Sequence, residues 1–200
     1  MKRLLVCLTI LAAVLSGCGS GAPEEHRIVE QDQAEAEIML LPDELPRDFV
    51  FCSGAGAWST ELTLNRDGTF SGMHHDSDMG STGEGYPNGT VYICRFEGRF
   101  EVVDQIDEYT YSLRLAELTM SETPGTEKIV EGVRHIAAEP YGLESGTDFL
   151  LYLPGTPYEL LTEDFLFWQL WRGDMGNEKN SLSGYAIRNV ATEYGFFSVD

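Results

Sequence analysis

Basic residues are scarce in this sequence. Lys and Arg together number 13 against 33 Asp and Glu in 200 residues, so the formal net charge is −20. After residue 3 the only lysines are Lys128 and Lys179, too few for an extended basic patch. A chain this acidic disfavours nucleic acid and anionic lipid headgroups as partners. We therefore expect no nucleic-acid partner and a strongly solvated surface.

Long hydrophobic runs are also absent. The main apolar-rich stretch, Leu4 to Leu15, would span about 18 Å as a helix, whereas the hydrocarbon core of a bilayer is about 30 Å thick. A permanent transmembrane helix is therefore not expected there. Lys2 and Arg3 precede the stretch, and the small residues Ser16 and Gly17 follow it, which is the pattern of a secretory signal peptide.

Catalytic signatures are lacking as well. No Gly-x-Ser-x-Gly elbow surrounds Ser145, and the four histidines have no motif context. Paired carboxylates carry no weight as a glycosidase signal, because 33 acidic residues allow many pairs. The sequence thus gives no direct support for an enzyme.

The stretch Leu15-Ser16-Gly17-Cys18 resembles the lipobox of bacterial lipoprotein precursors. The resemblance implies that residues 1–17 are a lipoprotein signal peptide and that Cys18 becomes the lipidated first residue of the mature protein. The mature protein would then work outside the cytoplasm, anchored to the bacterial cell membrane by the lipid on Cys18. The alternative is an ordinary signal peptide with a chance cysteine.

The chain after Cys18 divides into a linker and a folded domain. Residues 19–23 are small and flexible, and residues 24–41 are acidic without a clear apolar stripe. We therefore expect residues 18–47 to hold the lipidated cysteine and an acidic linker. A single folded domain is expected over residues 48–200.

Alternating apolar and polar residues predict short strands through most of this domain. In residues 57–65, for example, Trp58, Thr60 and Leu62 share one face, and Asn65-Arg66-Asp67-Gly68 then predicts a hairpin turn. Gly98 falls in an inward-facing series, where a bulge or bend is expected. The predicted strands cover residues 57–65, 69–75, 89–102, 108–115, 129–137, 148–153, 183–190 and 193–199. Helical spacing of apolar residues predicts one short helix near 158–171.

These patterns predict an all-β fold, an antiparallel barrel of about eight strands with one short helix. The opening motif resembles that of bacterial lipocalin-like domains, and its residues are Gly56, Trp58, Asn65, Asp67, Gly68, Thr69 and Phe70. Residues 51–58 and 86–92 also resemble stretches of secreted proteins of Gram-positive gut bacteria, a group that implies no activity. The resemblance implies a lipocalin-like barrel and an extracytoplasmic location.

Two cysteines remain beyond the leader and the lipobox. Cys52 and Cys94 allow one pairing, and an oxidising compartment permits a disulfide between them. The alternative is two buried thiols, which are common in protein cores.

The loop after the second predicted strand carries the only suggestive metal pattern. Asp76, Asp78 and Glu84 offer hard oxygen ligands for calcium, although their spacing does not fit an EF-hand. A zinc pair of His74 and His75 is disfavoured, because adjacent residues of a strand point to opposite faces. The alternative to calcium is a solvated loop, and no other cofactor is expected.

A ligand site, if present, is expected inside the barrel mouth. The inward aromatic residues that would line it are Trp58, Tyr92, Phe96, Tyr109 and Tyr111. The alternative is a filled core, because an eight-stranded barrel is narrow enough for side chains to fill. The leading hypothesis is a non-catalytic, lipid-anchored binding or interaction protein whose small-molecule or protein ligand is unknown. An envelope-anchored hydrolase and a purely structural accessory protein are the alternatives.

Overall fold

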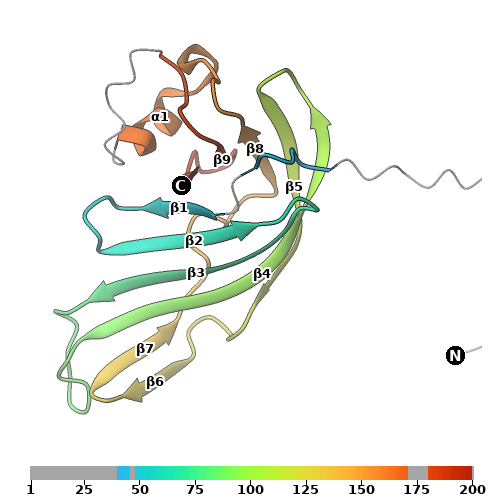
Figure 1. The fold of residues 1–200 in the computed structure, drawn as a ribbon. Helices are drawn as coiled ribbons and strands as arrows, with labels where there is room; N and C mark the ends of the chain where they lie inside the picture. The colour runs from blue at the N-terminus through green and yellow to red at the C-terminus, as the bar shows by residue number, and fades with distance from the viewer. Residues whose placement is uncertain (1–39, 46–47, 171–179, 200) are drawn as a thin grey trace, which may run out of the picture. The chain divides into compact units, whose positions relative to one another are not determined.

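The structure is a computed structural model that describes residues 40–45, 48–170 and 180–199 (Figure 1). The predicted signal peptide, Cys18 and most of the predicted linker lie outside the described residues. Among the helices of the described part, none has both the length and the apolar character needed to cross a membrane.

Strands dominate the described chain. The helical elements are a 3₁₀ turn, η1 (Tyr158–Leu160), and one helix, α1 (Glu163–Leu170). The strands are β1 (Asp48–Cys52), β2 (Trp58–Leu64), β3 (Thr69–Asp78), β4 (Thr90–Gln105), β5 (Thr110–Met120), β6 (Glu127–Val130), β7 (Val133–Ala137), β8 (Asp148–Tyr152), β9 (Ala186–Asn189) and β10 (Gly195–Ser198).

Eight of these strands close into a ring. The neighbours around it are β1, β2, β3, β4, β5, β8, β9 and β10, and β10 pairs back to β1. Every pairing in the ring is antiparallel, and the strands follow one another in chain order, which is the up-and-down topology. The predicted all-β, eight-stranded antiparallel barrel with one short helix is therefore confirmed.

The membership of the ring differs from the prediction in one respect. Residues 129–137 were expected to form one barrel strand, but the chain reverses between Val130 and Val133 to give the hairpin of β6 and β7. Glu131 and Gly132 take φ values of 51° and 79°, and positive φ at both central residues is typical of a two-residue hairpin turn. β1 takes the place in the ring that was expected for residues 129–137.

The β6–β7 hairpin extends the sheet beyond the ring. β4 is 16 residues long and has two successive neighbours along one edge. Its residues 90–93 pair in parallel with β7, and its residues 96–105 pair with β5. Figure 1 shows the hairpin, in yellow, beside the first half of β4. The sheet therefore reaches past the barrel rim on this side.

Alternation along each strand builds the core, as the sequence predicts. In β1, Phe49 and Phe51 are fully buried, whereas Asp48, at the start of the strand, is exposed. The predicted turn at residues 65–68 is present: Gly68 has φ +83° and its N–H donates to Asn65 O at 3.0 Å. A Cβ on residue 68 would lie 2.1 Å from a β4 carbonyl oxygen, so only glycine fits this approach.

The barrel interior also contains a piece of the chain. We call residues 138–147, between β7 and β8, the inner segment. Thr60 of β2 donates to Tyr141 O at 2.7 Å, and the Asn189 side chain of β9 donates to Gly142 O at 3.0 Å. Leu143 is 1% exposed within the main core cluster. Because inward-facing side chains of several ring strands contact it, the inner segment fills the middle of the barrel.

Gly98 makes room for an aromatic ring. A Cβ at this position would lie 2.5 Å from the Phe70 ring, so the missing side chain is what allows that ring to pack inward. The bulge expected at Gly98 occurs slightly later, as register shifts between Arg99 and Phe100 and again after Val102.

The helix predicted near 158–171 is broken into two pieces. η1 ends at Leu160, because the next residue, Leu161, is extended (φ −105°, ψ 151°). α1 begins after Thr162, whose hydroxyl accepts from Phe165 N at 3.3 Å. Phe165 is fully buried with Tyr152 and Phe197 in a second cluster. Helix α1 therefore covers the outer face of the last strands of the ring.

Packing starts before the predicted domain boundary at residue 48. Leu41 is 1% exposed and belongs to the core cluster, and its N–H donates to Arg66 O at 3.1 Å. Arg66 also forms an ion pair with Asp43 at 2.8 Å. The last part of the predicted linker is thus held against the β2–β3 turn.

The predicted bridge between Cys52 and Cys94 is not formed, and both thiols are free. Cys52 lies on β1 and Cys94 on β4, so β2 and β3 separate them. Three strand spacings of about 4.8 Å place them about 14 Å apart along the curved sheet, against a reach of about 7 Å for disulfide Cα atoms. Counting cysteines could not reveal the strands between them.

Candidate functional site

A hollow of about 420 Å³ opens at the mouth of the barrel. We call it the mouth cup. Its lining residues are Trp58, His74, Asp76, Tyr92, Ala138 and Tyr141. They come from the start of β2, the end of β3, the start of β4 and the inner segment, which meet at one end of the barrel. The volume lies within the range of small-molecule sites.

Strand register explains why these side chains meet. Trp58 pairs with Asp76, and Asp76 pairs with Tyr92 across three neighbouring strands. Residues directly opposite one another in a sheet point to the same face, so all three side chains face inward at the rim. Tyr141 joins this lining from the inner segment, whose backbone is held to β2 by the hydrogen bond from Thr60 to Tyr141 O.

His74 is held in one neutral form within the cup. The single hydroxyl proton of Thr60 is donated to Tyr141 O at 2.7 Å, so in the 2.9 Å contact between Thr60 Oγ1 and His74 Nδ1 the imidazole is the donor. Burial lowers the pKa of His74, although the charge of Asp76 and the carbonyl of Ser59 partly oppose this. In the neutral ring Nδ1 therefore carries the proton, and Nε2 has the lone pair of an acceptor.

The aromatic rings of the cup are fixed by their neighbours. The rings of Trp58 and Tyr141 lie 4.8 Å apart at 74°, edge to face. Phe51 supports both, with ring centroids 4.8 Å from Trp58 and 5.4 Å from Tyr141. Tyr141 Oη is also hydrogen-bonded to Tyr194 Oη at 3.2 Å, and burial followed by this bond raises the pKa of the Tyr141 phenol. The cup walls are therefore preorganised.

Two of the five predicted ligand residues line the mouth cup. Trp58 and Tyr92 lie there, whereas Phe96 is 4% exposed in the core. Tyr111 pairs with Gln105 at the far end of β4, and Tyr109 precedes it, so both lie at the other end of the barrel. Among the described residues, large side chains such as Phe100, Leu113 and Phe149 pack together in the barrel core, and the hollow that contains predicted ligand residues lies at the mouth.

Four residues of the cup are not among the predicted ligand residues. His74 and Asp76 share the inward face of β3 with Phe70, a periodicity that was available in the sequence. Ala138 and Tyr141 lie in no strand, and no local pattern places them at the mouth.

The proposed calcium ligands do not form a cluster. Within the described ranges no three His, Cys, Asp or Glu side chains are arranged to hold a metal ion. Asp78 Oδ1 accepts from Gly80 N at 3.0 Å and from Ser81 N at 3.1 Å, and thereby shapes the turn after β3. His74 and His75 point to opposite faces, as predicted, toward Thr60 and Ser59 respectively. The calcium hypothesis for Asp76, Asp78 and Glu84 gains no support from this arrangement.

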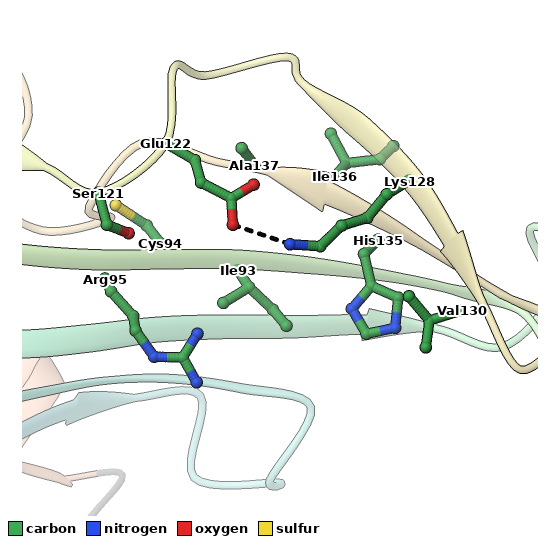
Figure 2. A pocket seen from close by; sticks show the side chains of 10 residues that line it. All are labelled: Ile93, Cys94, Arg95, Ser121, Glu122, Lys128, Val130, His135, Ile136 and Ala137. Atoms are coloured by element: carbon green, nitrogen blue, oxygen red, sulfur yellow. Dashed lines mark hydrogen bonds and ion pairs between the residues drawn. The ribbon is translucent and has the colours of Figure 1, made fainter.

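A second hollow, of about 250 Å³, lies where the neighbour of β4 changes from β7 to β5 (Figure 2). Its lining residues are Ile93, Cys94, Arg95, Ser121, Glu122, Lys128, Val130, His135, Ile136 and Ala137. Figure 2 shows Lys128 reaching across to Glu122, and their ion pair measures 2.8 Å. This pair, led by its hydrogen bond, lowers the pKa of Glu122, so the group is a carboxylate.

The chemistry of this second hollow gives little support to catalysis. Burial raises the pKa of the Cys94 thiol to about 11, whereas a nucleophilic cysteine needs a lowered pKa. Among the described side chains, Cys94, Ser121 and His135 make no hydrogen bond to one another, so no nucleophile is coupled to a base.

Comparisons of this chain with models of protein families, with curated proteins and with solved structures find no significant match. The function proposed below for this chain therefore rests on the geometry of the mouth cup.

Proposed function

We propose that this chain is a non-catalytic, lipid-anchored binding protein that works outside the cytoplasm and takes a small ligand in its mouth cup. The observation that carries the proposal is the cup itself, a hollow of about 420 Å³ with aromatic walls and a few polar groups at its edge. Most ligand sites combine these properties.

The supports of the cup favour binding over a catalytic role. The aromatic walls rest on Phe51 and on the Tyr141–Tyr194 hydrogen bond, so little side-chain freedom is left to lose when a ligand enters. His74 and Asp76 are the candidate bases among the described lining residues, and no Ser or Cys nucleophile accompanies them there.

The anchor belongs to the same proposal. The basic residues 2–3, the apolar stretch 4–15 and the lipobox-like residues 15–18 favour lipid attachment at Cys18. Cys18→Ala should release the protein from membranes or leave an uncleaved precursor. Intact-mass data with a different mature N-terminus and no lipid mass would contradict this part.

The binding function is tested by a thermal-shift screen of metals, lipids, sugars and small organic molecules on the whole protein. Hits should be lost in Ala138→Phe, which fills the cup, and kept in Ala116→Phe, which places the same ring at an exposed position of β5. A ligand that binds Ala138→Phe as well as the wild type would show that the cup is not the site.

A further inference from the structure

The lining of the mouth cup carries a negative charge and, among its described residues, no Lys or Arg. Asp76 is the only Asp, Glu, Lys or Arg among the lining residues. Its Oδ1 accepts from Ser77 N at 2.7 Å, and the carboxylate keeps further acceptor capacity for a ligand. His74, which also lines the cup, is neutral and brings no positive charge, and its Nε2 is an acceptor. The cup therefore offers acceptors and negative charge to whatever enters it.

The described basic side chains Arg95, Lys128 and Arg134, of the strands β4, β6 and β7, are not among the residues that line the cup. Arg134 stacks on Tyr86 at 4.6 Å and donates to Thr90 Oγ1 at 3.2 Å. Arg95 and Lys128 line the second hollow and not the cup. An anionic ligand in the cup would meet Asp76 without a cationic partner, which is unfavourable in a partly desolvated site.

The aromatic walls favour a cation over a neutral apolar ligand. Trp58, Tyr92 and Tyr141 are all half-buried, so part of each side chain remains open to the cup. The face of an aromatic ring is negative and attracts an ammonium group, most strongly for Trp. A neutral apolar ligand that covered Asp76 would instead displace water from its carboxylate and supply no hydrogen-bond donor or positive charge in its place.

From these observations we propose that the mouth cup selects a small organic cation, an alkylammonium group held against Trp58, Tyr92 and Tyr141 with Asp76 as its counter-ion. This inference rests on the proposed binding function and names the ligand class for the same site. The overall charge of −20 adds attraction for a cation as it approaches.

The test is isothermal titration of the whole protein with choline and butylammonium. 3,3-Dimethyl-1-butanol, which has nearly the shape of choline without its charge, is the matched neutral ligand. Choline or butylammonium should bind at least about tenfold more tightly than the neutral ligand. Equal affinities for the cations and the neutral ligand would overturn the proposal.

Two charge-removing variants make the test specific. Asp76→Asn keeps an oxygen for Ser77 N–H and should weaken cation binding at least about tenfold. Asp104→Asn removes one charge at an exposed position of β4 away from the cup and should change the affinity by less than about twofold. Equal losses in the two variants would show that only the overall charge matters and would refute a specific counter-ion.

The outcomes also separate this inference from the proposed function. If no cation binds but a neutral molecule from the screen binds wild type and not Ala138→Phe, the cup is a binding site and the cation proposal is wrong. If the cations bind equally well to Ala138→Phe, both proposals for the cup are wrong. Melting temperatures of all variants, measured first, exclude loss of folding as the cause.

Discussion

Asn189 holds the inner segment to the ring, and its replacement tests how much this connection stabilises the barrel. The side chain is completely buried on β9. Its amide nitrogen donates to Gly142 O at 3.0 Å and to Glu144 O at 3.2 Å, and its oxygen accepts from Ala191 N at 3.0 Å. Asn189→Ala removes all three hydrogen bonds and leaves their backbone partners inside the protein.

The expected loss follows from the burial of those partners. The bond to Gly142 O is fully buried and the other two are partly buried. A buried group left without a partner costs about 1–3 kcal/mol, and a partly buried one less because water can reach it. We therefore expect Asn189→Ala to lower the free energy of unfolding by about 3–4 kcal/mol. With a urea m-value of about 2 kcal/mol/M, the midpoint should fall by about 1.5–2 M.

The assay is urea unfolding followed by tryptophan fluorescence. Asn88→Ala is the matched control, because its side chain donates one exposed bond, to Glu131 O at 3.1 Å. The control should lose less than about 1 kcal/mol. A loss below about 1 kcal/mol in Asn189→Ala, or one equal to that of the control, would refute the view that these bonds hold the inner segment in place.

Three further predictions concern the interior and its ionisable groups. Gly142→Ala should destabilise the protein more than Gly125→Ala. Both glycines have positive φ, but a Cβ at 142 would lie 2.7 Å from a core ring atom, whereas a Cβ at 125 meets nothing within 4 Å. Equal melting temperatures of the two variants would contradict this. In the folded protein, iodoacetamide at pH 8 should label Cys52 and not Cys94, because Cys94 is buried and burial raises its pKa to about 11. Unfolding should make Cys94 reactive. Peptide mapping that finds both cysteines equally labelled in the folded protein would disprove this. Because the pKa of His74 is lowered by folding, the unfolded chain takes up a proton there first, so stability should fall as pH drops through about 6.5. Urea midpoints at pH 7.5 and 5.5 should therefore fall further for wild type than for His74→Gln, and identical falls would exclude the His74 contribution.

The barrel could be predicted from the sequence because each strand has a local pattern of alternating apolar and polar residues. Alternation in residues 58–64 and 90–102 and the turn at 65–68 depend only on near neighbours, and these features appear in the structure. The turn at Glu131-Gly132 was missed because a glutamate with φ 51° is unusual, and the apolar residues on both sides continue the strand pattern.

Only part of the cup lining could be predicted from local sequence patterns. Trp58 and Tyr92 could be placed inward by their strand periodicity, and His74 and Asp76 could have been placed in the same way from Phe70. The position of Tyr141 depends on long-range bonds such as Thr60 to Tyr141 O, which spans 81 residues. No local pattern carries that information, so the presence of Tyr141 in the cup could not be predicted.

The position of the inner segment in the chain has a consequence for folding during synthesis. Residues 138–147 follow the first five ring strands and precede β8, β9 and β10, which complete the ring. Whether the chain emerges from a ribosome or from a membrane channel, the first five ring strands therefore come out first, then the inner segment, and last the three strands that close the ring. The chain end never has to pass through a finished ring, so the filled barrel can form without a knot.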